Sequence, residues 1–323
     1  MNIFRLAFVA FVSCSIMSSS ALAQATYPTK PITVVVPFAA GGNLDVVTRL
    51  VATSMSRSLG QPLVIDNKSG AGGVVGHQAG ARAPADGYTV TATANGSFAV
   101  TPRLQQRSPF KGDDFAAVGS IASTPLVIEV SAGSRFRSIA DLLAFARANP
   151  LQVNVGHSGN GTTNHVAILL LQDAAQVKFN IVPYKGSSPA LTDLLGGQID
   201  AMVDQLPSSL AHLQAGKLRA LAVTTKDRTA DLPAVPTLNE TGQKGFDVST
   251  VTGLLVPEKT PESVVSSLNR ALNVALQEPG IQQRLREMGS EPRSSTPAQF
   301  KAFLRQEETK AELLVKRGLI KDE

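Results

Sequence analysis

The chain alternates short, almost continuously apolar segments with longer segments that are apolar along one face. Residues 32–36 read Ile-Thr-Val-Val-Val, which is typical of a parallel strand covered on both faces. Pro37 ends this strand, and Gly41 and Gly42 allow a tight turn into a helix that we expect to end at Gly60. The apolar face of this helix comprises Val46, Val47, Leu50, Val51 and Met55.

The order of strand, loop and helix repeats along the rest of the chain. Two helix starts have the spacing of capping boxes, formed by Ser138 with Asp141 and by Thr296 with Gln299. This order predicts a doubly wound α/β architecture, and the length of 323 residues favours two domains. The other expected strands lie near residues 63–65, 88–94, 153–155, 181–182, 201–203, 218–223 and 251–256, and other helices start at Ser188-Pro189 and Thr260-Pro261.

The first 23 residues have the pattern of a cleaved secretory signal peptide. Arg5 precedes an apolar run over residues 6–17, and Ala21-Leu22-Ala23 is the small-residue pattern at which signal peptidase cuts. A membrane anchor is one alternative, but this run is shorter than the roughly 20 residues that span a bilayer. A lipoprotein at Cys14 is another, although the three residues before it form a poor lipobox. We therefore expect cleavage after Ala23 and a periplasmic protein.

Composition narrows the chemistry of the mature chain. Cys14 is the only cysteine, so removal of residues 1–23 excludes disulfides, thiol catalysis and thiolate metal sites. The formal charge of +5 becomes +4 without Arg5, and no long basic run accompanies it, which argues against nucleic-acid binding. Aromatic residues make up 5% of the chain and tryptophan is absent, so stacking platforms for bases or sugars are not expected.

The loop after the first strand is the most informative candidate for ligand binding. It lies at the carboxyl end of an expected parallel strand, where open α/β sheets bind ligands. Its small residues let the backbone approach a ligand, and the helix N-terminus that follows favours an anion. A plain glycine turn is the alternative, and Asp45 suits helix-dipole stabilisation or ordering of the loop equally well. The candidate ligand-binding residues here are Phe38, Ala39, Ala40, Gly41, Gly42 and Asp45.

A second loop of small and hydroxyl-bearing residues, 156–163, also opens a helix. It is similar to a nucleophile elbow, but that motif requires glycine where Asn160 stands. A serine hydrolase using Ser158 and His165 stays an alternative. His157 and His165 are interpreted as loop and helix-surface residues in preference to metal ligands, because no carboxylate cluster lies nearby. If two lobes close, this loop faces the first one, and its candidate ligand-binding residues are Ser158, Gly159, Asn160, Thr162 and Thr163.

Other strand ends supply further candidate ligand-binding residues. Asn95 and Ser97 follow the strand expected at 88–94, and Tyr184 lies between a strand end and a helix start. Asp204 follows the strand at 201–203, where a carboxylate can accept from a ligand ammonium or hydroxyl group or cap the next segment.

The glycine-rich segment 70–76 does not predict a nucleotide site. A dinucleotide fingerprint would need glycine at Val75, and Asp86 lies in a turn where the motif needs an acidic strand end. We therefore expect a glycine turn that leads into a packed helix, and no cofactor.

Short sequence segments follow one another through the whole chain in a specific order and spacing. Together they resemble the substrate-binding receptors of tripartite tricarboxylate transporters, also called Bug or TctC-type receptors. The segments are Tyr27 to Ile32, Pro37 to Asp45, Gly60 to Pro62, Asp66 to Gly73, Pro84 to Thr89, Val182 to Gly186, Leu194 to Asp200, Ala215 to Thr224 and Leu232 to Thr237.

This resemblance implies a type II periplasmic binding protein fold, with two α/β lobes joined by crossover strands around a ligand cleft. Lobe 1 is expected to comprise residues 24–125 and 249–323, and lobe 2 residues 126–248. The implied function is capture of a small carboxylate solute (a dicarboxylate, an amino acid or an aromatic acid) through the loops 38–42 and 158–163. Delivery to membrane permease subunits follows, by a monomeric protein that is not an enzyme and holds no metal.

Two departures from the family pattern make transfer of ligand identity unsafe. The His-x-Ala-Gly-Glu pattern after the second loop reads His165-Val166-Ala167-Ile168-Leu169, and Val251 stands where an aromatic residue is common. A sensor that presents its ligand to a signalling protein is the alternative to transport.

Overall fold

The computed structural model describes residues 27–104 and 107–320, so the expected signal peptide, its cleavage site and Cys14 lie outside the described residues. The strands are β1 (Ile32–Val36), β2 (Leu63–Asn67), β3 (Thr89–Ala94), β4 (Phe115–Ser131), β5 (Asn154–His157), β6 (Asn180–Pro183), β7 (Ala201–Gln205), β8 (Leu218–Val223), β9 (Ser249–Pro257) and β10 (Glu291–Pro292). The α-helices are α1 (Asn43–Leu59), α2 (Val74–Ala81), α3 (Asn95–Ala99), α4 (Ile139–Ala148), α5 (Thr163–Ala175), α6 (Ser187–Leu195), α7 (Leu206–Gln214), α8 (Glu262–Gln277), α9 (Pro279–Glu287) and α10 (Pro297–Lys316). Short 3₁₀ helices are η1 (Ala71–Gly73), η2 (Thr101–Leu104) and η3 (Gly112–Asp114).

The described strands form one mixed sheet in the order β2-β1-β3-β9-β4-β7-β5-β6, with β8 and β10 also paired to β4. β1 is parallel to β2 and β3, and β5 is parallel to β6 and β7. Helices follow these parallel strands, as their right-handed crossovers require. β9 is antiparallel to both β3 and β4, which places the two longest strands side by side at the centre of the sheet.

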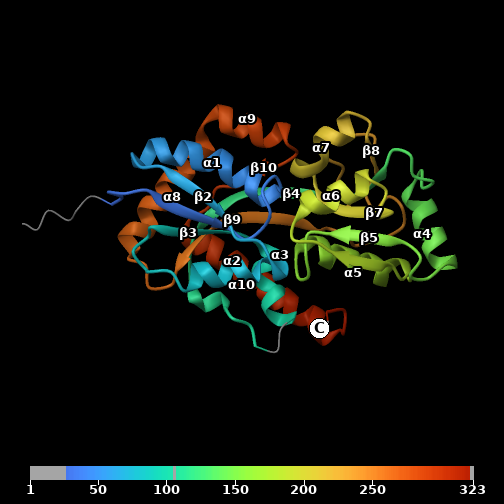
Figure 1. Cartoon of the computed structure of the whole chain (residues 1–323), viewed down its shortest axis with the longest axis horizontal. Coiled ribbons are helices and arrows are strands. Elements are labelled where there is room, and N and C mark those ends of the chain that lie inside the picture. The colour runs from blue at the N-terminus through green and yellow to red at the C-terminus, as the bar shows by residue number, and fades with distance from the viewer. Residues whose placement is uncertain (1–26, 105–106, 321–323) are drawn as a thin grey trace, which may run out of the picture.

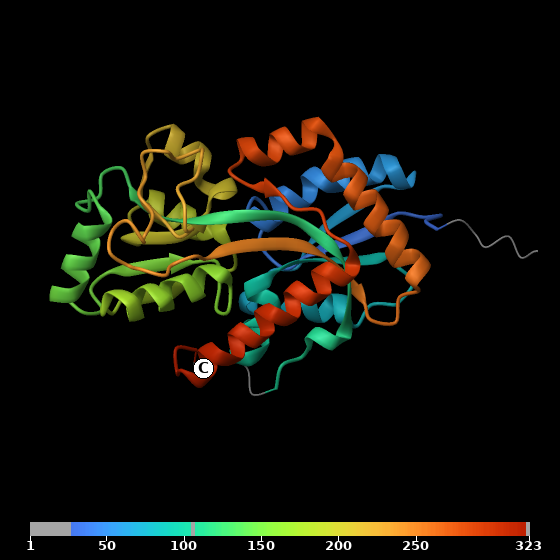
Figure 2. The same cartoon turned by 180° about the vertical axis from the view of Figure 1, so that it is seen from behind.

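β4 and β9 run side by side from one half of the molecule into the other and so connect the two halves (Figures 1 and 2). For reference, the first half denotes residues 27–125 with 249–320, and the second half denotes residues 126–248. Figure 1 shows α1, α8 and α9 above the sheet of the first half and α2, α3 and α10 below it. The second half, on the right of the same view, carries α4 to α7.

Separate apolar cores hold the two halves. In the first half, buried residues of β1 pack with α1 and α8, including Val34, Val51 and Leu272. The opposite face of that sheet buries Phe115 against Phe300 of α10. The second half has its own core, in which β4, β5 and β7 pack against α4 and α5. Each core therefore fixes the strand ends of its own half.

Several elements expected from the sequence have the predicted ends. β1 is buried along most of its length, and α1 ends at Gly60, whose φ of 69° is left-handed. Both capping boxes are present, on α4 and α10. α6 begins at Ser187, one residue before the Ser188-Pro189 start that the sequence predicts.

The sequence pattern does not predict β4 or α7. β4 contains Gly119 and Pro125, and its pairing with β9 shifts register between Ala117 and Gly119 and again between Ser120 and Ala122. Such bulges bend a strand and break the two-residue period that identifies it in a sequence. α7 has Pro207 in its first turn, where a missing N–H costs little.

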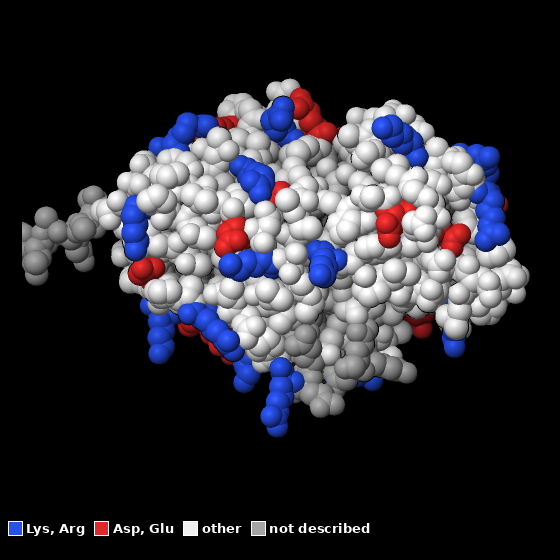
Figure 3. Space-filling view, viewed as in Figure 1, with Lys and Arg blue, Asp and Glu red and all other residues white. Residues whose placement is uncertain are grey.

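The surface carries mixed charge. Figure 3 shows lysine, arginine, aspartate and glutamate side chains scattered over this face, without a continuous patch of either sign. Within residues 27–104 and 107–320, none of the helices combines the length and the apolar character that crossing a bilayer requires.

Candidate functional site

A small cavity lies between the two halves, at the end of the sheet where β1, β5 and β7 finish. The space in it open to water-sized molecules is small in this conformation, about 30 Å³. The first half contributes Phe38, Gly42, Asn43, Leu44, Ala94, Ser97 and Thr250, and the second half Ser158, Thr162, Thr163, Ser187 and Gln205.

Four helices begin at this cavity. Gly42, Thr162 and Gln205 are the N-caps of α1, α5 and α7, and Ser187 is the first residue of α6. The first N–H groups of a helix have no partner inside the helix and carry partial positive charge. Since α1 belongs to the first half and the other three helices to the second, both halves direct these groups at the same space. This geometry favours an anionic group.

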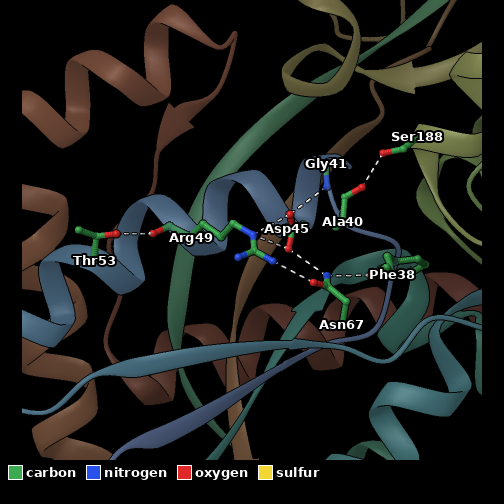
Figure 4. A network of polar contacts seen from close by, with 8 residues as sticks. All are labelled: Phe38, Ala40, Gly41, Asp45, Arg49, Thr53, Asn67 and Ser188. Atoms are coloured by element: carbon green, nitrogen blue, oxygen red, sulfur yellow. Dashed lines mark hydrogen bonds and ion pairs between the residues drawn. The ribbon is translucent and has the colours of Figure 1, made fainter.

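Asp45 orders the first loop (Figure 4). Its carboxylate accepts from the Gly41 N–H at 2.9 Å, from Arg49 Nε at 2.9 Å and from Asn67 Nδ2 at 2.9 Å. Asn67 Nδ2 also donates to the Phe38 carbonyl at 3.1 Å, so both ends of the loop are tied to one network. The Arg49 hydrogen bonds lower the pKa of Asp45 although its burial opposes this. Of the two roles that the sequence leaves open for Asp45, the contacts correspond to ordering of the loop.

Two buried histidines shape the second loop. The rings of His157 and His165 stack at 4.7 Å between centroids, and their Nδ1 atoms accept from the N–H groups of Gly159 and Gly161, each at 3.2 Å. Burial lowers the pKa of His157 to about 3 and that of His165 to about 4, so both rings are neutral at pH 7. The expectation of surface histidines is wrong: 0% of His157 and 7% of His165 is exposed.

The hydrolase alternative receives no geometric support at Ser158. Its hydroxyl donates to Asn164 Oδ1 at 3.0 Å, while the nearby histidine nitrogens accept from backbone N–H groups. A nucleophilic serine needs a base as its hydrogen-bond partner. Within the described part of the chain, no group of three or more acidic, histidine or cysteine residues is arranged to hold a metal ion.

The predicted site residues fall into three groups. Phe38, Gly42, Ser97, Ser158, Thr162 and Thr163 line the cavity. Gly159, Asn160 and Tyr184 instead line a neighbouring hollow with η1 and η2, and the Tyr184 hydroxyl donates to Asp193 at 2.6 Å. Ala39, Ala40, Gly41, Asp45, Asn95 and Asp204 are not among the residues that line the cavity.

Asn95 connects three elements behind the cavity wall. Its Oδ1 accepts from the Thr163 hydroxyl and the Val251 N–H, both at 3.1 Å, and its Nδ2 donates to Glu307 of α10 at 2.8 Å. These bonds use the side chain internally and join the first half to α5 of the second.

Sequence reasoning missed Asn43, Leu44, Ala94, Ser187, Gln205 and Thr250 as cavity residues. Asn43 and Leu44 are the first residues of α1 and could have been found from the expected helix start. Ser187 belongs to the segment that the sequence indicates as part of a cleft. Within that segment the aromatic Tyr184 is the stronger candidate for a ligand contact from sequence alone. Gln205 and Thr250 carry no local signal, because the antiparallel strands β4 and β9 bring them into place.

The halves touch directly in this conformation. The Ser188 hydroxyl donates to the Ala40 carbonyl at 2.8 Å, as Figure 4 shows, and the Ala39 N–H donates to the Lys185 carbonyl at 3.3 Å. At the other rim, the Thr101 hydroxyl donates to the Asn160 carbonyl at 3.3 Å. The structure is therefore the closed arrangement of the two halves.

Two α/β halves bridged by paired long strands, with a cavity of helix N-termini between them, define the class of type II periplasmic binding proteins. Solved structures agree. The chain is 35% identical to the periplasmic binding protein BugD, with a TM-score of 0.88 over 92% of this chain and 100% of that one. It is 32% identical to MatC from Rhodopseudomonas palustris with bound malate, with a TM-score of 0.85 over 90% of this chain and 100% of that one. It is 34% identical to a second R. palustris protein, solved with adipate, with a TM-score of 0.88 over 92% of this chain and 100% of that one.

The model of the tripartite tricarboxylate transporter family receptors matches residues 47–319. The chain therefore belongs to this family, as its sequence motifs indicate, and the family consists of solute-binding receptors.

Proposed function

We propose that this protein is a periplasmic receptor that captures a small carboxylate-bearing solute by closure of its two halves. The observation that carries the proposal is the convergence of the N-termini of α1, α5, α6 and α7 on one buried cavity. The malate and adipate bound to two similar proteins support a carboxylate as the solute class. Binding without catalysis is part of this proposal, and the amide partner of the Ser158 hydroxyl, in place of a base, supports it.

The lobes that move correspond to residues 24–125 with 249–323 and to residues 126–248. The contacting groups are Phe38, Gly42, Asn43, Leu44, Ser97, Ser158, Thr162, Thr163, Ser187, Gln205 and Thr250. The other predicted site residues act indirectly: Ala39 to Gly41 form the backbone that Asp45 holds, and Asn95 joins the halves. The closed receptor then delivers the solute to membrane permease subunits.

Micromolar affinity follows from ordinary magnitudes. A hydrogen bond to a charged group contributes about 1.5–3 kcal/mol. Four or five such bonds, after the free-energy cost of ordering the solute and the site is subtracted, give a dissociation constant of about 1 μM. Closure is driven by the solute, because only the closed form lets it contact both halves at once.

Calorimetry and thermal unfolding with mono- and dicarboxylates, amino acids and aromatic acids test this function. We expect at least one carboxylate to bind with a dissociation constant of about 1–10 μM and to raise the melting temperature. A neutral sugar of similar size is the control and should do neither. A stabilising sugar together with inert carboxylates would contradict the anion site.

A further inference from the structure

The hydroxyl of Ser187 has a fixed direction. It lies at the cavity end of α6, and its oxygen is 2.5 Å from Asp204 Oδ1 and 3.4 Å from Gln205 Oε1. Both neighbours are acceptors, because Gln205 Oε1 also receives Asn164 Nδ2 at 3.2 Å. The Ser187 hydrogen must therefore point into the protein. Only the lone pairs of the hydroxyl are left for a solute in the cavity.

The group that holds this hydrogen is a fully buried carboxylate. Asp204, at 0% exposure on β7, also accepts from the Ser208 hydroxyl of α7 at 2.5 Å and from the Gln205 N–H. Burial raises the pKa of Asp204 to about 6 while these hydrogen bonds lower it, so the group is ionised at pH 7.5. Glu129 on β4 is the titratable group that faces it, and burial together with Asp204 raises the pKa of Glu129 well above its usual range, which favours its neutral form.

The other hydroxyls of the cavity follow the same pattern. Ser158 donates to Asn164 Oδ1 at 3.0 Å, Thr163 to Asn95 Oδ1 at 3.1 Å and Ser97 to the Ala94 carbonyl at 3.1 Å. Thr250 differs, because its hydroxyl accepts from Gln205 Nε2 at 3.2 Å and keeps its own hydrogen. The hydroxyls of Ser97, Ser158, Thr163 and Ser187 thus spend their hydrogens inside the protein and leave mainly acceptor lone pairs for the cavity.

We propose that Asp204 is a positioning residue that makes Ser187 a hydrogen-bond acceptor toward the cavity, so that the receptor prefers acids carrying a hydroxyl or ammonium group. This inference rests on the receptor function proposed above and names its substrate class. The solute carboxylate occupies the helix N-termini, and its hydroxyl or ammonium group donates to Ser187. An acid that lacks this donor leaves the buried Ser187 lone pairs unsatisfied, which is costly.

Matched pairs of acids test the preference. Succinate is compared with malate and aspartate, glutarate with 2-hydroxyglutarate and glutamate, and propionate with lactate and alanine, by calorimetry at pH 7.5. In each series whose members bind, we expect the acid with a hydroxyl or ammonium group to bind about 10-fold more tightly than the acid without one. The preference should fall below about 3-fold in Ser187→Ala, because the acceptor is gone.

Ser208→Ala is the matched control. It removes the other serine that donates to Asp204, but Ser208 is not among the residues that line the cavity. We expect its preference to equal that of the wild type when both are measured at pH 8.5, where Asp204 stays ionised even without the hydrogen bond that lowers its pKa. The preference is a ratio within one protein, so a general loss of stability or affinity cancels, and circular dichroism confirms that each variant is folded.

Asp204→Asn and low pH form the second test. An amide can donate to the Ser187 oxygen and release the serine hydrogen toward the solute, so the preference should shrink. Protonation of Asp204 does the same, and the wild-type preference should decrease from pH 7.5 to pH 5 because the pKa of Asp204 is about 6.

The outcomes separate the two proposals. Equal binding of both members of every pair, or a full preference in Ser187→Ala, overturns this inference and leaves the carboxylate receptor standing. If no carboxylate of either kind binds, the receptor function fails, and the inference fails with it.

Discussion

At the scale of single residues, the second loop depends on neutral histidines. Gly159 and Gly161 each donate their N–H to a ring nitrogen of His157 or His165, and both glycines have positive φ values of 126° and 79°. Protonation of either Nδ1 atom would remove its lone pair and break the loop contact. The depressed pKa values keep the lone pairs available over the physiological range.

Acid should therefore destabilise the protein through His157. The pKa of the ring is about 6.5 in the unfolded chain and about 3 when it is buried. As the pH falls, the unfolded state therefore takes up the proton first. For one such histidine, unfolding becomes easier by about 2 kcal/mol between pH 7 and pH 5. In His157→Asn the amide oxygen can still accept from Gly159, and this share of the pH dependence should disappear.

Urea unfolding at pH 7 and pH 5 measures the difference. The raised pKa of Asp204 acts in the opposite sense but is common to both proteins, so it cancels in the comparison. Identical pH dependence in the two proteins would show that His157 is not the group responsible.

Sequence patterns identify the residues that act through local structure and miss those that act through distant pairing. The small residues of the first loop announce a helix start after a strand, and Phe38 and Gly42 do line the cavity. Asp204 also follows a strand end, but its side chain turns inward to Ser187, which only the packing of α6 against β7 decides. Its position after the strand predicts ligand contact, whereas in the structure its carboxylate is buried and accepts from the Ser187 hydroxyl.

At the scale of elements, the close packing of β9 against α10 and β4 deserves a test of its own. Gly253 lies at the middle of β9, where an added Cβ would overlap the Phe300 ring and lie 2.6 Å from the Gly119 carbonyl oxygen. Phe300 is buried in the core of the first half and cannot easily yield. The sequence does not predict this contact, because a glycine within a strand can mark a bulge, a bend or a close approach of another segment.

Gly253→Ala should destabilise the protein by about 1–3 kcal/mol, the range for overpacking of a core. Gly133→Ala is the control, because no atom lies within 4 Å of a Cβ built at Gly133. Both free energies of unfolding come from urea titrations. A Gly253→Ala protein as stable as the control would mean that α10 moves aside at little cost.

At the scale of the whole molecule, closure brings backbone against backbone. A Cβ added to Gly72 of η1 would overlap the Asn160 carbonyl of the second half. Gly72 has a φ of 61°, so a side chain also meets conformational strain there. The rim of the closed arrangement therefore has room only for glycine at this position.

Gly72→Ala should hold the halves apart and weaken solute binding by about 10-fold or more. Gly60→Ala is a matched control, since its φ of 69° imposes similar strain but no atom lies within 4 Å of the added Cβ. Small-angle scattering with the tightest-binding carboxylate should show compaction for the control and little for Gly72→Ala. Equal compaction and affinity in the two variants would contradict a role for this contact in closure.

The fold itself was largely predictable, because the parallel strands and their helices are local and periodic. The two long central strands were less so. The apolar run of β9 predicts a strand, whereas the bulged β4, with Pro125 paired to Ser249, does not keep the period of a strand. Pairing between residues more than a hundred positions apart leaves no local trace in a single sequence.

The position of β9 between β3 and β4 also governs when the molecule can take shape. During synthesis β1 to β4 emerge early. β9, which pairs with β3 and β4, emerges only after the entire second half. Until residues 249–257 are made, β3 and β4 each lack the strand that pairs with them. The sheet of the first half therefore cannot be completed before then. A nascent chain of this order therefore stays incompletely folded until its last third has been made.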